Sequence, residues 1–398
     1  MALKISEIQV CRLEPPPSEG PGTQPTREGW HRTFRQATPF DRFDDRVTRR
    51  EPGGLIWVKA IAEDGTYGLG NTDTGDVATI LIRDCLAAAV IGQEVGAIDA
   101  CNDRMWHTTI SYGNEGLTAR AVAGVDLALW DLWGKVVDQP VYRLAGGPQR
   151  RSMDVYLTGN DVDWGQELGF SKFKLARPHS VYDGQAGIDG TVELIAKTRE
   201  QIGPQADLML DCWMAYDADY AVHMCEALRP YRMRWMEEML KPHDWKGLQN
   251  VRQRVPWQTL ATGEHWATRW PAQRAIEERL IDLIQADMRW VGGFTESAKI
   301  AHFADAAGLP MCLHTGGNDL YGQHWTAAMP NTPLIEYIQF SEPGVPLEEC
   351  YLGAPGESGR RCYRTTPGTP APVDGVLGLP PGPGFGLQVP DEWLVPVD

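Results

Sequence analysis

The sequence predicts an α/β fold in which a parallel β/α barrel follows a smaller α+β domain. From about residue 153 onward, eight short apolar runs rich in strand formers alternate with helical stretches. Eight is also the number of strands that closes a β/α barrel. No Gly-x-Gly-x-x-Gly motif opens this region, which disfavours a dinucleotide-binding sheet. The length of 398 residues suits two domains of unequal size.

The first part of the chain mixes predicted strands and helices. Residues 3–12 and 55–63 alternate apolar and polar side chains, as strands do, and the following DGTYGLG predicts a turn. Residues 77–91 and 97–109 predict helices. The segment 15–54 is polar and rich in Pro, Gly and Arg, yet it carries several aromatic residues. We expect it to form a lid over a functional site.

A long amphipathic helix is predicted at residues 118–137, where apolar side chains recur every three or four positions. We expect residues 1–120 to form an α+β capping domain and residues 121–364 to form the barrel. The Pro- and Gly-rich tail, 365–398, should pack back on the capping domain. Its apolar anchors are Val376, Leu377, Leu379 and Phe385.

The barrel strands are predicted from their apolar runs. They are residues 154–159, 172–176, 207–212, 234–239, 259–265, 283–288, 311–315 and 334–338. In such barrels the active site lies at the carboxyl ends of the strands. Polar side chains there converge on one pocket, although each is separated from the next by a β/α unit.

Charge and cysteine content limit the class of protein. There are 37 Lys and Arg against 53 Asp and Glu, a net charge of −16, so we expect neither nucleic acid nor an anionic membrane surface as a partner. No stretch resembles a membrane span, and the first residues do not resemble a signal peptide. The eight cysteines form no Cys-x-x-Cys pair, which favours reduced thiols in a cytoplasmic protein.

Three acids end consecutive strands: Asp211, Glu237 and Glu264. One carboxylate at a strand end is most often a helix N-cap. Three carboxylates in apolar runs are different, because like charges and burial both disfavour their ionised forms. A divalent cation relieves both effects. All-oxygen ligands predict Mg²⁺.

Five further residues, on four of the strands, suggest acid–base chemistry. His314 ends the seventh strand beside Asp287 of the sixth, which would orient the imidazole as a general base, although a lone strand histidine is usually a satisfied core residue. Lys172 and Lys174 share one face of the second strand, which in the simplest case is only a solvated face. Glu336 has no cationic neighbour in sequence. With a raised pKa it would donate a hydrogen bond to a substrate carboxylate.

These residues resemble the mandelate racemase subgroup of the enolase superfamily. The resemblance is carried by Asp211, Glu237, Glu264, the Asp287/His314 pair, Lys-x-Lys at 172–174, and the segments 122–147 and 374–387. It covers nearly the whole chain and implies a (β/α)7β modified TIM barrel with an N-terminal α+β capping domain. It also implies three Mg²⁺ ligands, a small sugar-acid substrate and a homo-oligomer.

Within the subgroup, LMLDCWM, RWMEE and TGEHW are most similar to L-rhamnonate dehydratases. Trp213 stands where racemase-like members more often have Asn, whereas Lys172 departs from the dehydratase pattern. The resemblance implies an acid-sugar dehydratase in which His265 and Trp213 border the polyol. His31 and Arg50 of the lid would close over its far end.

Two other functions remain open. A racemase or epimerase on the same scaffold would use Lys174 on one face of the substrate and His314 on the other. A non-catalytic member would only bind metal or ligand, and the intact acids argue against it.

Overall fold

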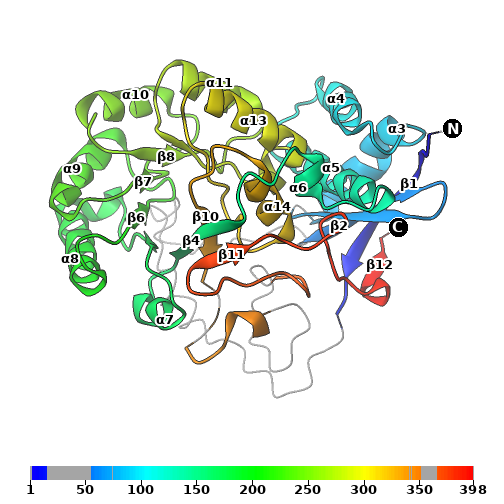
Figure 1. Cartoon of the computed structure of the whole chain (residues 1–398). Coiled ribbons are helices and arrows are strands. Elements are labelled where there is room, and N and C mark those ends of the chain that lie inside the picture. Colours follow the sequence, from blue (N-terminus) through cyan, green and yellow to red (C-terminus); the bar gives the residue numbers. More distant parts are fainter. Residues whose placement is uncertain are drawn as a thin grey trace.

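The computed structural model describes residues 2–15, 55–73, 75–339, 341, 343–350 and 365–397. The expected lid, with His31 and Arg50, therefore lies almost wholly outside the described residues. A small antiparallel sheet with its helices stands beside a larger curled parallel sheet surrounded by helices (Figure 1). In the part of the chain that is described, no helix combines the length and apolar character needed to cross a bilayer.

The small sheet has the strand order β12-β1-β2-β3 and is antiparallel throughout. Its strands are β1 (Ile5–Leu13), β2 (Ile56–Ala62), β3 (Tyr67–Thr72) and β12 (Leu394–Pro396). The predicted strands at 3–12 and 55–63 are confirmed. Because β12 pairs with β1, the end of the chain returns to complete the sheet that its beginning starts (Figure 1).

β3 is the element that the sequence analysis missed, because DGTYGLG predicted only a turn. The two glycines on this strand are required by the helix that lies against it, α5 (Leu117–Val136). A Cβ on Gly68 would lie 2.1 Å from the Leu132 backbone nitrogen, and one on Gly70 would lie 2.1 Å from the Gly124 carbonyl oxygen. Here alternate glycines allow a strand and a helix backbone to approach closely.

The helices of the capping domain are where the sequence predicts them. They are α2 (Gly75–Leu81), η1 (Ile82–Leu86), α3 (Ala87–Val90), α4 (Ile98–Thr109) and α5. The predicted amphipathic helix at 118–137 is thereby confirmed. Val125, Leu129 and Leu132 of α5 are fully buried in the core of the capping domain, whereas Leu127 packs in the barrel core. α5 therefore joins the two cores.

The large sheet has the order β10-β4-β5-β6-β7-β8-β9, and these seven strands are parallel. Its strands are β4 (Ser152–Thr158), β5 (Phe173–Ala176), β6 (Leu208–Asp211), β7 (Met236–Glu237), β8 (Leu260–Thr262), β9 (Leu283–Ile284) and β10 (Ile335–Ile338). The predicted strand at 311–315 is reduced to a single bridge between Met311 and Ile284. The modified β/α barrel with its N-terminal capping domain is confirmed.

Helices follow the strands and cover the outside of the barrel (Figure 1). The longer ones are α8 (Gly184–Ile202), α9 (Ala218–Leu228), α10 (Trp245–Arg254), α11 (Arg269–Glu277), α13 (Phe294–Ala306) and α14 (Leu320–Ala328). The shorter ones are α6 (Val141–Leu144), α7 (Val162–Glu167) and α12 (Met288–Val291). Inside the barrel, a separate buried cluster that includes Tyr156, Met209 and Trp235 fills the space below the strand ends.

The tail contacts both parts of the molecule. Its strand β11 (Val376–Gly378) pairs antiparallel with β4 of the barrel, and β12 pairs with β1. The buried Asp131 carboxylate on α5 accepts hydrogen bonds from the Leu69 and Phe385 backbone nitrogens, each at 2.8 Å. Lys135, one turn along the helix, pairs with the same carboxylate at 2.7 Å. One buried charge thus holds β3, α5 and the tail together.

His324 on α14 links Tyr142 to the tail through contacts that acid would break. Its Nδ1 accepts from the Tyr142 backbone nitrogen at 3.2 Å, and its Nε2 lies 2.9 Å from the Pro381 carbonyl oxygen. Both contacts require a neutral imidazole that carries its proton on Nε2. Burial lowers the pKa of His324 from 6.5 to about 3.

We predict that this histidine contributes to acid destabilisation. Below pH 6.5 His324 binds a proton in the unfolded chain but stays neutral in the folded chain. The free energy of unfolding therefore falls as the pH falls toward 3. Between pH 7 and 5 the His324 contribution is about 2 kcal/mol. Urea unfolding at pH 7 and pH 5 measures how much free energy of unfolding is lost between them. This loss should be smaller in His324→Asn than in the wild type, and it should equal the wild-type loss in His107→Asn, a control at an exposed histidine. Equal losses in all three proteins would contradict the assignment.

Candidate active site

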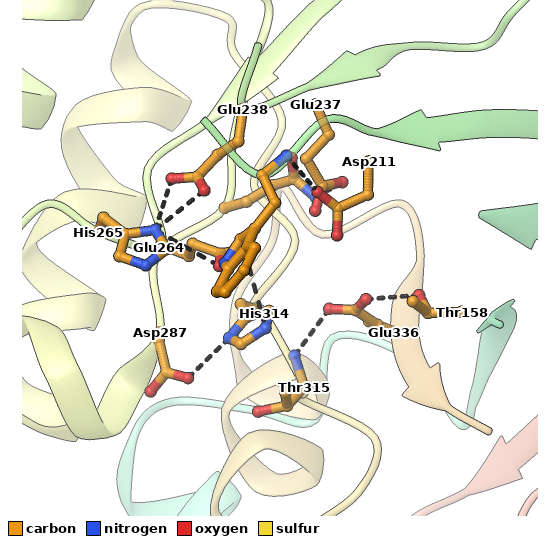
Figure 2. Close-up of polar contacts among 12 residues, drawn as sticks. Thr158, Asp211, Glu237, Glu238, Glu264, His265, Asp287, His314, Thr315 and Glu336 are labelled. Carbon is orange, nitrogen blue, oxygen red and sulfur yellow. Dashed lines mark hydrogen bonds and ion pairs between the residues drawn. The ribbon is translucent and has the colours of Figure 1, made fainter. Parts of the chain in front are cut away.

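Most of the predicted site residues lie at one end of the barrel, and Figure 2 shows the acids and the two imidazoles gathered there. Asp211 is the last residue of β6, Glu237 is the last residue of β7, and Glu264 follows β8 by two residues. All three side chains are buried. Adjacent strands therefore bring these acids to the same end of the barrel, as the β/α spacing predicted.

Glu237 points into the barrel and is fully hydrogen-bonded there. One carboxylate oxygen accepts from the Lys174 ammonium, and the other accepts from Trp235 Nε1 at 2.9 Å and Gln285 Nε2 at 2.7 Å. Lys174 Nζ also lies 2.7 Å from Glu336 Oε1. Although burial alone would lower it, the two carboxylates hold the pKa of Lys174 well above its ordinary value. Lys174 is therefore an ammonium clamped between two acids.

Lys172 is not brought to this site. Its ammonium lies 3.5 Å from the exposed Asp154 carboxylate, and the residue precedes the first residue of β5. Lys172 and Lys174 are two residues apart, which places them about 6.6 Å from each other along the strand direction. The expected catalytic role of Lys172 has no support in this geometry.

Glu336 differs from expectation in its protonation. It accepts from Thr158 Oγ1 at 2.5 Å and from the Thr315 backbone nitrogen at 2.8 Å, and it contacts Lys174. Burial raises its pKa, but the Lys174 ammonium and these donors outweigh burial and leave the pKa below its ordinary value. Glu336 is thus an ionised acceptor and not the protonated donor that the sequence suggested. The decisive partner, Lys174, lies five strands earlier in the chain, so sequence neighbours gave no signal.

His314 and Asp287 form the expected pair, with His314 Nδ1 2.8 Å from Asp287 Oδ2 (Figure 2). The other Asp287 oxygen accepts from the Arg289 backbone nitrogen at 2.8 Å and caps α12. Burial lowers the pKa of His314, but the Asp287 hydrogen bond and nearby acids raise it above its ordinary value overall. Since Nδ1 is engaged by Asp287, Nε2 is the nitrogen available for proton transfer. It lies 3.8 Å from Glu264 Oε2.

A second carboxylate–imidazole pair lies across from the first. His265 Nδ1 is 2.8 and 2.9 Å from the two oxygens of Glu238, a residue absent from the predicted site. Ligand atoms of Glu238, Glu264 and His265 all lie within 4.8 Å of one another. The Glu-Glu pair in RWMEE was the sequence signal for Glu238. Its side chain reaches His265 because Glu238 leaves the strand with a φ of 44°.

Trp213 borders the same end of the barrel. Its backbone nitrogen donates to Asp211 Oδ1 at 2.9 Å, and its φ of 38° turns the chain sharply after β6. The structure therefore brings together Asp211, Glu237, Glu264, His265, Asp287, His314, Glu336, Lys174 and Trp213. His31 and Arg50 lie outside the described residues.

The donor set fits a divalent cation with oxygen preference. Burial is the largest cause that raises the pKa of Asp211, of Glu264 and of Glu237, the last to about 7. Mutual repulsion adds to it: Glu238 and Asp211 raise the pKa of Glu264 further. Lys174 offsets only part of this charge. Burial and mutual repulsion disfavour the ionised form of these three acids. A bound Mg²⁺ would offset both effects and allow all three to ionise.

The choice between Glu237 and Glu238 as a metal ligand can be tested directly. Asp211 and Glu237 are register partners on neighbouring strands and so point to the same face of the sheet, whereas Glu238 leaves the strand toward His265. We therefore predict that Glu237→Gln abolishes Mg²⁺ binding in calorimetry and that Glu238→Gln retains it. Thermal unfolding of both variants controls for misfolding. Loss of binding in Glu238→Gln alone would assign the ion to the group of Glu238, Glu264 and His265.

Comparison with known proteins agrees with this geometry. The family described as "Mandelate racemase / muconate lactonizing enzyme, N-terminal domain" matches residues 38–146, and that described as "Enolase C-terminal domain-like" matches residues 162–393. An L-rhamnonate dehydratase from Saccharopolyspora erythraea is 36% identical over 362 residues, which cover 89% of this chain and 90% of that protein.

Solved structures of the same kind superpose along the whole chain. Rhamnonate dehydratase from Gibberella zeae complexed with Mg is 29% identical, with a TM-score of 0.86, over 99% of this chain and 96% of that one. A racemase from Streptomyces coelicolor A3(2) with bound magnesium is 22% identical, with a TM-score of 0.74, over 99% of this chain and 100% of that one; this likeness concerns the fold alone.

The two family matches together span most of the chain. The first covers β2, β3 and the helices α2 to α6, and the second covers the parallel strands from β5 to β10, with the acids and both imidazoles. This protein therefore belongs to the enolase superfamily, in its mandelate racemase subgroup.

Proposed function

We propose that this protein is a Mg²⁺-dependent acid-sugar dehydratase, with L-rhamnonate or a stereochemical relative as the first candidate substrate. The observation that carries the proposal is the His314–Asp287 pair beside a cluster of buried acids. The pair provides one base, whose Nε2 is not engaged by Asp287, next to a set of oxygen ligands. The 36% identical L-rhamnonate dehydratase supports the choice of substrate class.

Asp211, Glu237 and Glu264 would hold the cation, as their position at adjacent strand ends suggests. When bound, Mg²⁺ stabilises the negative charge that develops on the substrate carboxylate as the proton on the neighbouring carbon leaves. The ammonium of Lys174 stays with Glu237 and Glu336 and offsets part of their charge inside the barrel.

His314 would take the C2 proton at Nε2, because Asp287 engages Nδ1 and stabilises the imidazolium that results. The C2–H bond breaks, a C2–C3 double bond forms, and the C3–O bond breaks. The leaving hydroxyl takes a proton from the same imidazolium and departs as water. The remaining enol tautomerises to a 2-keto-3-deoxy acid. His265 and Trp213 would border the polyol. As lid residues, His31 and Arg50 would close over its far end.

An epimerase would need a second base on the other face of the substrate, and Lys174 was its candidate. The ammonium of Lys174 is only 1% exposed and is paired with two carboxylates. A protonated, clamped lysine is poorly suited to remove a proton. The geometry therefore favours dehydration over epimerisation.

The reaction class is tested with a panel of five- and six-carbon aldonates and Mg²⁺. We expect a semicarbazide-reactive keto acid from L-rhamnonate or a stereochemical relative, and no product after the divalent cation is chelated. An aldonate recovered with inverted C2 would support the epimerase instead. Failure to bind Mg²⁺ would support a non-catalytic member.

The base is tested by hydrogen exchange at C2 in D₂O, followed by NMR. We expect His314→Asn to lose both exchange and dehydration while Mg²⁺ binding persists. The loss should reach at least about a hundredfold, the usual contribution of a positioned general base. Lys172→Ala is the matched control and should keep both rates, because Lys172 contacts Asp154 and not the site. Exchange that persists in His314→Asn would assign the proton to another group.

A further inference from the structure

Trp290 lies between the two imidazoles of the site. Its ring centroid is 5.2 Å from that of His265 and 5.2 Å from that of His314, with interplanar angles of 50° and 45°. Carboxylates hold both imidazoles at their ring nitrogens: Glu238 and Asp287 contact Nδ1 of His265 and His314, and Glu264 lies 3.5 Å from His265 Nδ1 and 3.8 Å from His314 Nε2. The indole adds a ring contact to each imidazole. The orientation of Trp290 therefore limits the orientation of both imidazoles.

The orientation of Trp290 is set from the capping domain. Trp290 Nε1 donates to Asp73 Oδ2 at 2.6 Å, and Asp73 directly follows β3. The other Asp73 oxygen accepts from Arg120 Nη1 on α5 at 2.7 Å. The Arg120 guanidinium carbon also lies 4.3 Å from the centroid of the Trp290 ring. Two residues of the capping domain thus hold one indole of the barrel. Asp73 binds its N–H group, and the Arg120 guanidinium lies against its ring.

We propose that Asp73, Arg120 and Trp290 form a positioning clamp through which the capping domain sets the orientation of His265 and His314. The proposal rests on the proposed function for its kinetic consequence only. The clamp residues are positioning residues, because the described hydrogen bonds and ring contacts of their side chains are with each other and with the imidazoles. The indole cannot shift without losing a charge-assisted hydrogen bond, a cation–π contact and two ring contacts.

The clamp explains why a barrel that carries its own acids and base needs its capping domain close by. Asp73 lies 217 residues from Trp290 in sequence. The side chains of Arg120 and Asp73 are 23% and 25% exposed, so their ion pair is partly shielded from solvent and salt. A change at Asp73 should therefore affect the imidazoles without contacting them.

The decisive measurement is NMR of the histidine ring protons at fixed pH. An indole 5 Å away displaces their resonances by its ring current, and His265→Asn and His314→Asn assign them. We expect Asp73→Asn and Trp290→Phe to shift the resonances of both histidines. Asp76→Asn is the matched control: Asp76 stands three residues further along the same capping segment but pairs with the exposed Arg12 at 2.8 Å. It should shift neither resonance.

The kinetic measurement separates positioning from general stability. We expect Asp73→Asn to lower kcat about tenfold with KM changed less than about twofold, as for other groups that orient catalytic side chains. The control Asp76→Asn should keep both constants. Both variants should unfold thermally within a few degrees of the wild type.

The outcomes distinguish this proposal from the proposed function. Unchanged histidine resonances in Asp73→Asn would overturn the clamp, whatever the activity. If the wild-type protein dehydrates no aldonate, the proposed function fails, and the resonance shifts alone still decide the clamp. Shifted resonances with an unchanged kcat on a confirmed substrate would also overturn it, because orientation would then have no consequence for the chemistry.

Discussion

Buried negative charge at the mouth of the barrel is the constraint on which the rest of the site depends. Asp211, Glu237, Glu238, Glu264 and Glu336 are all buried there. Within the barrel, Lys174 pairs with two of them, and His265 contacts a third. Carboxylates kept this close destabilise one another unless cations share the space. A metal site and two imidazole pairs are the arrangement that makes so acidic a pocket compatible with a folded barrel.

The same constraint assigns different roles to chemically similar groups. Glu237 and Glu336 share the Lys174 ammonium, yet burial leaves the pKa of Glu237 raised to about 7. Burial also raises the pKa of Glu336, but the charges of Lys174 and His314, with the hydrogen bonds to Glu336, leave it lowered. His314 and His265 each face a carboxylate, but the first pairs with the acid that caps α12 and the second with the residue after a strand end. Environment, and not residue type, separates a structural charge from a reactive one.

Periodicity and strand-end position were sufficient to predict the barrel, the helix α5 and the positions of Asp211, Glu237, Glu264, Asp287 and His314. Both signals are local, and a repeating β/α unit converts local position into spatial convergence. The features that were not predicted depend on contacts between residues far apart in the sequence. β3 was missed because its glycines respond to a helix some sixty residues later, and the pKa of Glu336 depends on Lys174. The contact of Lys172 with Asp154, and the partnership of Glu238 with His265, likewise join strands that no sequence window contains.

The pairing of β12 with β1 has a consequence for how such proteins can be recombined. The sheet beside the barrel combines β1 with β12, nearly four hundred residues later, and the tail that supplies β12 also pairs with β4 through β11. If the segment that carries β1, β2 and β3 were exchanged between two relatives, the original β12 would have to pair with a foreign β1. A functional chimera therefore has to inherit β1 and β12 from one parent, however far apart the two strands lie in the sequence.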